Sequence, residues 1–431
     1  MNPVKPDAAR RPFRSTNRNP PDPKSVDVAI FGAGPAGLAT ALALRQAAPR
    51  VSVLVIRNEG SGPARTAETL PPPAEPLLKH LGAWDALVRD GHLPSFGSAA
   101  AWGGSSLQTH DYIFHPHQRG WHIDRSRFDA LLVRIARDHE IPILDAVRAD
   151  PITLIPQPIP PHGKGWRFAV PSADPKSQGR VIEAGWVVDA TGRGAVMARK
   201  LGARRELHDR LVAAVRRFQM PRAFLESEHR SLVESFEHGW ASLGWTPEGH
   251  GIVAFMTDDD LAVAARLRSE ERWASWLEHT PHLRSRLRSA LPLGPVTIRP
   301  AQSGRLDRVS GDRWIAVGDA ASTLDPLSSM GVFKALRSGI IASFALRDHL
   351  EGIEAAWERY GTWVRREYDG YWGGRTEFYR AERRWPSAPF WRRRQGLLMF
   401  SAGTGGPPDG LPTPCSISTR NADICSYGSI L

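Results

Sequence analysis

The chain has 431 residues, 41% of them hydrophobic and 23% charged, which is the composition of an ordinary globular protein with room for two domains. No apolar run is long enough to cross a bilayer, and the first 24 residues lack the apolar centre of a secretory signal, so we expect a cytoplasmic protein without a membrane partner. Lys and Arg outnumber Asp and Glu by 56 to 45, a net charge of +11, yet no nucleic-acid-binding motif is present.

The basic excess therefore favours an acidic protein partner over nucleic acid, with a merely solvated basic surface as the alternative. The two cysteines, Cys415 and Cys425, lie in the polar C-terminal tail. They form neither a disulfide framework nor a metal-ligand spacing, so we expect a reducing compartment and no metal site.

The first motif follows an arm at residues 1–24 that is rich in Pro, Arg and Asn and is expected to be disordered. An apolar strand at residues 26–31 runs into Gly-x-Gly-x-x-Gly and then into an alanine-rich helix. The first glycine allows the tight turn, the second lets the backbone approach a pyrophosphate, and the third lets helix and strand pack closely. The pattern predicts a dinucleotide site rather than a plain strand-to-helix turn, with contacts from Gly32, Gly34, Ala36 and Gly37.

A second parallel strand is expected at residues 51–56. Dinucleotide folds usually place an acidic residue about twenty positions after the glycines, where it holds the ribose hydroxyls. Arg57 occupies that position here, and Glu59 lies slightly beyond it. An arginine there would suit a 2′-phosphate, so this first motif alone does not choose between cofactors.

The next segment runs from Arg65 to three consecutive prolines at residues 71–73, and we expect it to be an extended loop before a short helix ending at Leu81-Gly82. This pattern resembles the Arg-x-x-Glu-x-Leu-Pro-Pro loop of the FAD-dependent monooxygenase and halogenase superfamily. The resemblance implies that Arg65 and Glu68 lie along the flavin side of the cofactor. A surface salt bridge between them is the alternative.

Residues 120–132 look like the start of a helix that this superfamily also carries. Asp124 or Ser126 would cap the helix, and Phe128 would lie on its buried face with Leu131 and Leu132. The resemblance implies that Arg125 contacts an FAD phosphate. A strand at 142–147 and a β-meander around 152–185 are expected to follow.

The second motif, at residues 187–193, resembles the strand ending in Asp-Ala-Thr-Gly of flavoprotein hydroxylases. In those proteins the chain returns beneath the cofactor at this point. The likeness implies that Asp189 and Gly192 shape the turn next to FAD.

Residues 206–296 are interpreted as an inserted substrate domain. Strands are expected at 231–236 and 250–257, and helices between residues 260 and 291. Trp240 and Trp245 are placed in loops between these strands. Some of the chain's 15 tryptophans would line an aromatic pocket, although simple core packing is the plainer explanation for each one.

The third motif is the most specific of the three, because a buried strand delivers Gly318-Asp319 and the loop Asp-Pro-Leu-Ser-Ser-x-Gly then begins a long helix at residue 332. In the superfamily this aspartate bonds the ribityl hydroxyls of FAD, which implies that role for Asp319. The backbone of Pro326, Ser329 and Gly331 would face the flavin ring, where the helix N-terminus stabilises the negative charge of the reduced flavin.

Taken together, the motifs predict an α/β protein with a Rossmann-like FAD-binding domain of the group A flavin monooxygenase type, an inserted β-sheet domain and C-terminal helices. The FAD-binding domain is expected at 25–95, 118–205 and 297–350, and the substrate domain at 96–117 and 206–296. A basic helical region at 351–400 and a loose tail at 401–431 complete the chain. The three FAD motifs overrule the NADP reading of Arg57.

Within the superfamily, the halogenase pattern is incomplete. Tryptophan halogenases need a lysine beyond the Leu-Gly helix and a Trp-x-Trp-x-Ile-Pro segment. Residues 95–102 contain no lysine, and residues 239–245 do not reproduce the second motif, so halogenation is disfavoured. The chain is more similar to the flavoproteins that mature tryptophylquinone enzymes, on segments that include Gly120-Trp121-His122 and Arg384-Trp385-Pro386. Among these it looks most like the monooxygenase for the quinohemoprotein amine dehydrogenase γ-subunit precursor.

This resemblance implies that reduced FAD reacts with molecular oxygen and that oxygen passes to a peptidyl tryptophan of an acidic protein or peptide. No second dinucleotide motif follows a strand, so NAD(P)H would bind transiently, or a separate reductase would supply the electrons. His115 and His117 are the candidates for a catalytic base. The rival hypotheses are a hydroxylase of a small aromatic molecule and a non-catalytic flavoprotein that holds an assembling partner.

Overall fold

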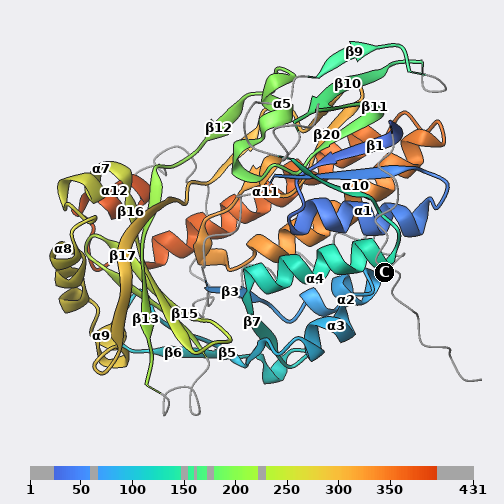
Figure 1. Cartoon of the computed structure of the whole chain (residues 1–431). Coiled ribbons are helices and arrows are strands. Elements are labelled where there is room, and N and C mark those ends of the chain that lie inside the picture. Colours follow the sequence, from blue (N-terminus) through green and yellow to red (C-terminus); the bar gives the residue numbers. More distant parts are fainter. Residues whose placement is uncertain are drawn as a thin grey trace, which may run out of the picture.

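The computed structural model describes residues 24–58, 67–146, 154–159, 163–171, 179–221 and 230–395. Two large β-sheets, with long helices packed against and between them, make up most of this part of the chain (Figure 1). The predicted N-terminal arm except Lys24, the whole tail at 401–431 with both cysteines, and Arg65 lie outside the described residues. No helix among the described residues has the length and apolar character needed to cross a membrane.

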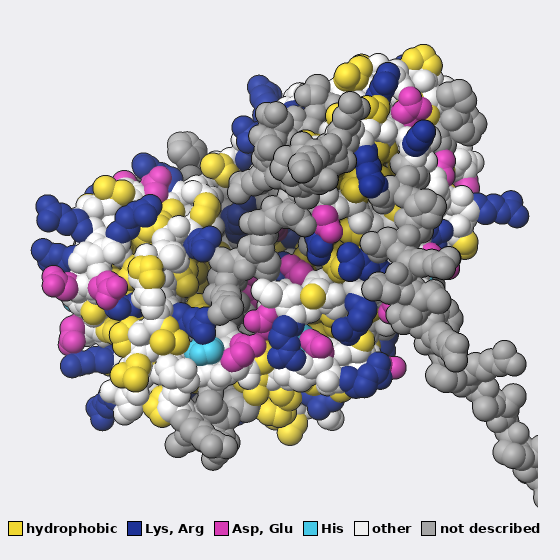
Figure 2. All heavy atoms as spheres, viewed as in Figure 1, with side chains coloured by type: hydrophobic (Ala, Val, Ile, Leu, Met, Phe, Trp, Pro, Cys, Tyr) yellow, Lys and Arg dark blue, Asp and Glu magenta, His cyan; other side chains and the backbone are white. Residues whose placement is uncertain are grey.

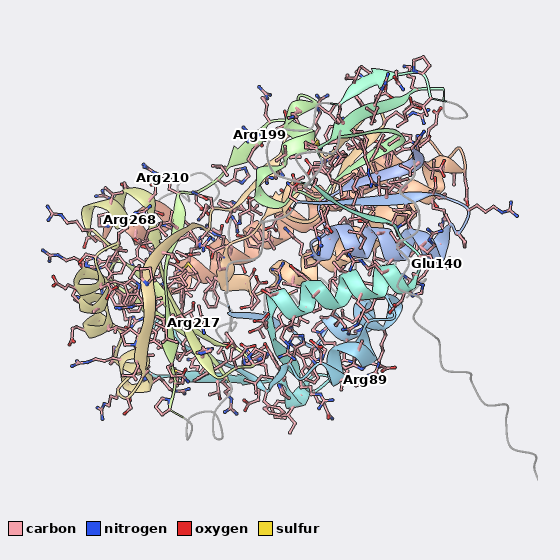
Figure 3. The ribbon with its side chains drawn as sticks, viewed as in Figure 1. Arg89, Glu140, Arg199, Arg210, Arg217 and Arg268 are labelled. Carbon is pink, nitrogen blue, oxygen red and sulfur yellow. The ribbon has the colours of Figure 1, made fainter. Side chains whose placement is uncertain are left out.

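Basic side chains are scattered, not gathered in one stripe, on the face of the described residues that Figure 2 shows. Figure 2 shows Lys and Arg scattered over the visible face and interspersed with Asp and Glu. In Figure 3 the exposed side chains of Arg199, Arg210 and Arg268 come from three different segments of the chain.

The first large sheet has the parallel core of a dinucleotide-binding fold. Its central strand β1 lies between β11 and β2, with Val28 opposite Trp186 on one side and Val53 on the other. β8 and β20 extend the parallel part, and β9, β10 and β19 add antiparallel strands. The eight strands are β1 (Ser25–Phe31), β2 (Val53–Asn58), β8 (Ile143–Ala146), β9 (Ile155–Gln157), β10 (Gly165–Val170), β11 (Arg180–Asp189), β19 (Ser310–Gly311) and β20 (Trp314–Ala316).

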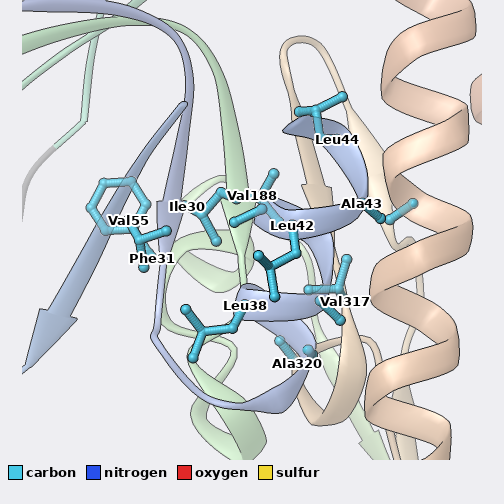
Figure 4. Packing of buried hydrophobic residues seen from close by; sticks show 14 of the residues in the cluster. Ile30, Phe31, Leu38, Leu42, Ala43, Leu44, Val55, Val188, Val317 and Ala320 are labelled. Atoms are coloured by element: carbon cyan, nitrogen blue, oxygen red, sulfur yellow. The ribbon is translucent and has the colours of Figure 1, made fainter. Parts of the chain in front are cut away.

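Helix α1 (Pro35–Ala47) is buried between this sheet and α10 (Gly331–Leu350). Figure 4 shows its Leu38 and Leu42 side chains among Ile30 and Val188 of the sheet. The two helix backbones touch at Gly339, where a Cβ atom would lie only 2.4 Å from the carbonyl oxygen of Ala36. The apolar, alanine-rich sequence of α1 permits this all-round burial.

The second large sheet is antiparallel except for the parallel pair β14 and β5. Its order is β17-β13-β16-β15-β14-β5-β6. The strands β5 and β6 come from an early segment of the chain, whereas β13 to β17 come from residues 211–300. The strands are β5 (Gly97–Ala101), β6 (Gln108–Asp111), β13 (Leu211–Gln219), β14 (Ser231–Phe236), β15 (Gly239–Trp245), β16 (His250–Asp258) and β17 (Leu291–Pro300). The predicted domain boundaries themselves stay a prediction.

Two three-stranded sheets connect these parts. One contains β3 (Ala67–Leu70), β7 (Gly120–Asp124) and β4 (Leu93–Ser95), and the other β12 (Arg205–Leu207), β18 (Gly304–Leu306) and β21 (Ser322–Thr323). The other α-helices among the described residues are α2 (Ala74–His80), α3 (Trp84–Arg89), α4 (Arg125–Asp138), α5 (Val196–Lys200), α7 (Asp259–Ala264), α8 (Glu270–Ser275), α9 (Pro281–Arg286), α11 (Ala356–Ala381) and α12 (Pro389–Gln395). Short 3₁₀ helices are η1 (Tyr112–Phe114), η2 (Gly192–Gly194), η3 (Trp276–His279), η4 (Gly318–Ala320) and η5 (Pro326–Ser328).

Helix α11 spans the two halves of the molecule (Figure 1). Tyr360 and Trp363 near its start belong to the core around the parallel sheet, whereas Phe378 and Tyr379 near its end belong to a core on one face of the seven-stranded sheet. A helix of 26 residues is long enough to bridge both cores.

Most expected elements are present, and the prediction was wrong in two places. Residues 67–70 form strand β3 instead of an extended loop, because the prolines begin only at residue 71 and leave the preceding N–H groups free to pair with β7. Trp240 and Trp245 lie within β15 and are buried on opposite faces of its sheet. The alternation of this segment is that of a strand.

The meander of β9, β10 and β11 is confirmed, as is the cap of α4 by Asp124, whose carboxylate accepts a hydrogen bond from the backbone N–H of Arg127 at 2.8 Å. Phe128 is completely buried on the inner face of that helix, together with Leu131 and Leu132.

Candidate functional site

A cavity of about 510 Å³ lies between the carboxyl ends of the parallel strands and one face of the seven-stranded sheet. Gly34, Ala190 and Val317, which follow β1, β11 and β20, form one wall. Ligands of open α/β sheets bind at this edge. The other residues discussed below that line the cavity are Ala36, Glu68, Thr69, Arg125, Gly192, Arg193, Ser231, Trp240, Arg299, Asp319, Asp325, Pro326, Ser329 and Gly331.

The N-termini of the two long helices α1 and α10 open on this cavity. A Cβ atom added at Gly34 or at Gly331 would meet nothing within 4 Å, so a ligand can approach both backbones closely. Neither helix has an acidic residue in its first turn. Both ends therefore present unpaired N–H groups and the positive end of a helix dipole, an arrangement that suits phosphate and a reduced flavin ring.

The other two glycines of the first motif shape the turn and do not line the cavity. Gly32 has φ of +117°, and a Cβ atom there would lie 2.2 Å from the carbonyl oxygen of Ala190. A Cβ atom at Gly37 would lie 2.0 Å from the carbonyl oxygen of Gly32. Both positions therefore require glycine for backbone packing.

Asp319 stands in the cavity wall with its carboxylate held by cations. Its Oδ1 accepts a hydrogen bond from Lys334 Nζ at 2.9 Å, and Arg193 Nε lies 3.8 Å from its Oδ2. Burial by itself would raise the pKa of Asp319, but the charges of Lys334 and Arg193 outweigh it and lower that pKa below the usual range. An ionised carboxylate here can accept hydrogen bonds from the hydroxyl groups of a ligand.

Glu68 and Arg125 meet at the opposite side of the cavity. Arg125 Nη1 donates to Glu68 Oε1 at 2.7 Å, and the same guanidinium bonds both oxygens of Asp129 at 3.2 Å. Burial would lower the pKa of Arg125, but the two carboxylates raise it. The predicted cofactor contacts Glu68 and Arg125 are thus brought together at the cavity, as partners of each other.

Asp189 lies beneath the cavity and does not line it. Its Oδ1 accepts from the backbone N–H of Thr191 at 2.9 Å, and its Oδ2 accepts from that of Ala198 at 2.8 Å. The carboxylate is completely buried. It fixes the turn that presents Gly192 to the cavity, which is the shaping role that the second motif implies.

The loop before α10 is fixed by Asp325. Its Oδ1 accepts from the backbone N–H of Leu327 at 3.0 Å and caps η5, which holds Pro326. Ser329 follows in the left-handed conformation, with φ of +50°, and turns the chain into α10. This brings Pro326, Ser329 and Gly331 to the cavity, as the third motif predicts.

The rest of the cavity wall is apolar and belongs to the second sheet. Side chains two residues apart on β13 and β16 line it, as expected for one face of a strand. Trp240 of β15 contributes an indole ring to the same wall. The apolar lining residues of these strands include Ala213, Val215, Val233, Ile252, Ala254 and Met256.

Three predicted site residues lie away from the cavity. Arg57, at the end of β2, is ion-paired with Asp145 on the neighbouring strand β8, 2.5 Å from Nε to Oδ1. His115 and His117 follow η1 at the edge of the second sheet, and His117 lines a separate groove, where its Nδ1 is 3.4 Å from Glu75 Oε2. The chain leaves the sheet edge after β6, which carries both histidines away from the cavity wall.

A buried network behind the loop that precedes α10 was not predicted. Asp325 Oδ2 accepts from Arg375 Nε at 3.0 Å and from the Tyr379 hydroxyl at 2.8 Å. The same hydroxyl accepts from the indole N–H of Trp240 at 2.9 Å. Arg375 and Tyr379 lie four residues apart on α11, and no local motif marks them.

The comparisons with known proteins agree with this architecture. A family model described as FAD binding domain matches residues 25–358. The protein named FAD-dependent oxidoreductase LodB, of Marinomonas mediterranea, is 26% identical over 379 residues, which are 87% of this chain and 98% of its own length.

Two solved structures illustrate the range of related functions. The flavin-dependent halogenase CmlS has a TM-score of 0.74 and 25% identity, over 86% of this chain and 67% of its own. The peptidyl tryptophan dihydroxylase QhpG has a TM-score of 0.64 and 24% identity, over 88% of this chain and 80% of its own, a likeness that shows the shared fold. The protein therefore belongs to the FAD binding domain family and has the fold of the flavin-dependent monooxygenases and halogenases.

Proposed function

We propose that this protein is an FAD-dependent monooxygenase that hydroxylates the indole ring of a tryptophan residue in another protein. The observation that carries the proposal is the cavity described above, whose lining includes two helix N-termini on one side and an apolar sheet face on the other. A cofactor held at one side would have its reactive edge directed at an aromatic ring held at the other.

The residues present fit FAD. The N–H groups at Gly34 would hold the pyrophosphate, the Asp319 carboxylate would accept from the ribityl hydroxyls, and the N-terminus of α10 would face the flavin ring. When bound and reduced, FAD supplies the electrons that activate molecular oxygen. The chain itself orients the two reactants and keeps water from the apolar side.

The apolar wall suits an electron-rich ring without a charge. Trp240 and Met256 offer an aromatic face and a polarisable sulfur to an indole. Three arginines also line the cavity. Arg125 is paired with Glu68 and Arg193 lies beside Asp319, while the exposed Arg299 is on the edge strand β17, opposite Ala213.

A protein substrate is supported by two further observations. One is the likeness in fold to the peptidyl tryptophan dihydroxylase QhpG. The other is the net charge of +11, which would attract an acidic protein or peptide that carries the target tryptophan. The electrons would come from NAD(P)H or from a separate reductase.

Halogenation is the second candidate, because halogenases such as CmlS share the fold. The lysine on which tryptophan halogenases depend has no counterpart in residues 95–102. Nor do the cavity-lining residues that the structure describes include any lysine. Hydroxylation therefore remains the proposal.

The test mixes chemically reduced holoenzyme, oxygen and an unmodified tryptophylquinone-enzyme precursor subunit, and weighs the subunit by mass spectrometry. We expect one or two added oxygen atoms on a single tryptophan. A parallel reaction contains free tryptophan and indole. An unchanged subunit, together with efficient hydroxylation of a free aromatic compound, would contradict the proposal of a protein substrate.

A further inference from the structure

Thr69 and His122 form a pair at the cavity wall, with Thr69 partly exposed and His122 completely buried behind it. They lie opposite each other in the antiparallel pairing of β3 with β7, so their side chains share one face. Thr69 Oγ1 is 3.1 Å from His122 Nδ1. Thr69 also lines the cavity, whereas His122 is completely buried.

The carboxylates that line the cavity are already engaged. Glu68 is the partner of Arg125, Asp319 that of Lys334, and Asp325 that of Arg375 and Tyr379. Within the described part of the chain, the lining contains neither histidine nor lysine. The His122 imidazole is a base that the cavity reaches through one side chain, the Thr69 hydroxyl at 3.1 Å.

We propose that Thr69 and His122 relay a proton out of the cavity during the reaction. The ring carbon that gains a hydroxyl group must lose its hydrogen as a proton, while the electrons of the broken C–H bond return to the ring. Thr69 Oγ1 takes this proton as its own hydroxyl proton moves to His122 Nδ1. This inference rests on the proposed hydroxylation, whose oxidant is molecular oxygen with reduced FAD.

The relay gives each of the two residues one role. His122 must have its proton on Nε2 at the start, so that Nδ1 accepts from the Thr69 hydroxyl. The proton returns through Thr69 once the product has left, which restores both residues for the next cycle. Thr69 is the group at the cavity wall, and His122 is the positioning residue behind it.

A neighbouring hydroxyl extends this pair along the cavity wall. Ser231 Oγ, which also lines the cavity, is 3.5 Å from Thr69 Oγ1. Ser231 begins β14 of the second sheet, so the two hydroxyls meet where β3 approaches the apolar face. The relay therefore opens at the side of the cavity proposed for the aromatic ring.

The kinetic test uses holoenzyme and a synthetic tryptophan peptide whose indole ring carries either hydrogen or deuterium. Thr69→Val and His122→Gln should each lower kcat by about 100-fold, with KM and FAD content unchanged. Both variants should show a primary isotope effect that the wild type lacks, because ring proton loss becomes slow. Thr69→Ser should restore the wild-type behaviour.

Thr257→Val is the matched control, because the buried Thr257 hydroxyl of β16 donates to the carbonyl oxygen of His238 at 2.8 Å and lies outside the cavity lining. If Thr69→Val and His122→Gln behave like Thr257→Val while the wild type hydroxylates the peptide, the relay is wrong and the proposed function stands.

A second measurement needs no turnover. Nitrogen NMR of histidine-labelled holoenzyme should show the His122 Nδ1 resonance moving when indole is added to the wild type and to Thr69→Ser, but not to Thr69→Val. If the peptide is not oxygenated by the wild type, the proposed function fails, and this measurement alone decides the relay. If the His122 Nδ1 resonance does not move when indole is added to the wild type or to either variant, the proposed relay is wrong.

Discussion

Lys334 keeps Asp319 ionised, although the carboxylate is partly buried in the cavity wall. Burial favours the neutral acid, and the ammonium group at 2.9 Å reverses that preference. Lys334 also donates to the carbonyl oxygen of Ser322, so the cation is held in place from two sides. Two predictions follow from this arrangement at the scale of single residues.

Asp319→Asn should weaken FAD binding. Hydrogen bonds to a charged group contribute about 1.5–3 kcal/mol, so the dissociation constant should rise by roughly 10- to 100-fold. Fluorescence titration of apoprotein with FAD measures this change. Asp369→Asn is the control, since Asp369 makes an exposed ion pair with Arg305 on the surface. Equal FAD affinity in the two variants would remove Asp319 from the cofactor site.

Lys334→Met should make FAD retention sensitive to mild acid. The pKa of Asp319 is lowered in the wild type, so its contribution is present above the ordinary carboxyl pKa and is lost only as pH falls through the lowered value. Without Lys334, burial dominates, the pKa rises, and FAD should dissociate at a higher pH. The flavin released into filtrate is measured from pH 7 downward.

Lys79→Met, which removes an exposed pair between Lys79 and Glu75, should release FAD as the wild type does. If Lys334→Met also retains FAD to the same acid limit, the account of Asp319 is wrong.

Among the helices, α11 links the loop before α10 to the second sheet. Arg375 is almost fully buried and bridges two carboxylates, Asp325 at 3.0 Å and Asp209 at 2.9 Å. The two carboxylates raise its pKa against the effect of burial. One helix thus fixes the loop before α10 and, through Tyr379, the cavity residue Trp240.

Arg375→Met should destabilise the protein by about 3–5 kcal/mol, because it leaves two carboxylates in the interior without their cation. Tyr379→Phe should cost about 1–3 kcal/mol, since Trp240 and Asp325 each lose a hydrogen-bond partner. Denaturant unfolding of the holoenzyme gives both values. Arg365→Met, on the exposed side of the same helix, should leave the free energy of unfolding nearly unchanged. An equally small effect of Arg375→Met would show that Arg375 does not hold the loop before α10 in place.

The sequence predicts those parts of the site whose residues are neighbours in the chain. The turn after β1 was predicted because strand, glycines and helix are contiguous, and the loop before α10 was predicted for the same reason. β3 was missed because the neighbouring prolines dominated the interpretation, and β15 was missed because Trp240 and Trp245 were assigned to loops between the strands on either side.

The unpredicted parts of the site are contacts between distant segments. Arg375 lies 50 residues from Asp325, and His122 lies 53 residues from Thr69. The sequence around one residue of each pair carries no pattern that indicates its partner, because the contact depends on how α11 and β7 pack in the folded chain. The candidate base was therefore placed on His115 and His117, which belong to an exposed segment after η1.

At the scale of the whole molecule, positive charge is spread over the surface and includes no stripe on the face seen in Figure 2. Such a distribution speeds encounter with an acidic partner without fixing its orientation. Orientation would then come from the cavity, which must receive the tryptophan ring while the rest of the partner stays outside.

Binding of an acidic precursor subunit should therefore weaken steadily as salt rises from about 0.05 to about 0.5 M, through a slower association rate. Surface plasmon resonance on the holoenzyme separates the association rate from the dissociation rate. An association rate that is independent of salt would show that the charge of +11 has no part in partner binding.

The choice between oxygen transfer and halogenation tests the central claim most directly. Reduced holoenzyme is mixed with ¹⁸O-labelled dioxygen and a precursor subunit in the presence of bromide, and the modified tryptophan is identified by mass spectrometry. The account predicts labelled oxygen on the indole ring and no bromine. Bromotryptophan, or a hydroxylated ring whose oxygen comes from water, would contradict it.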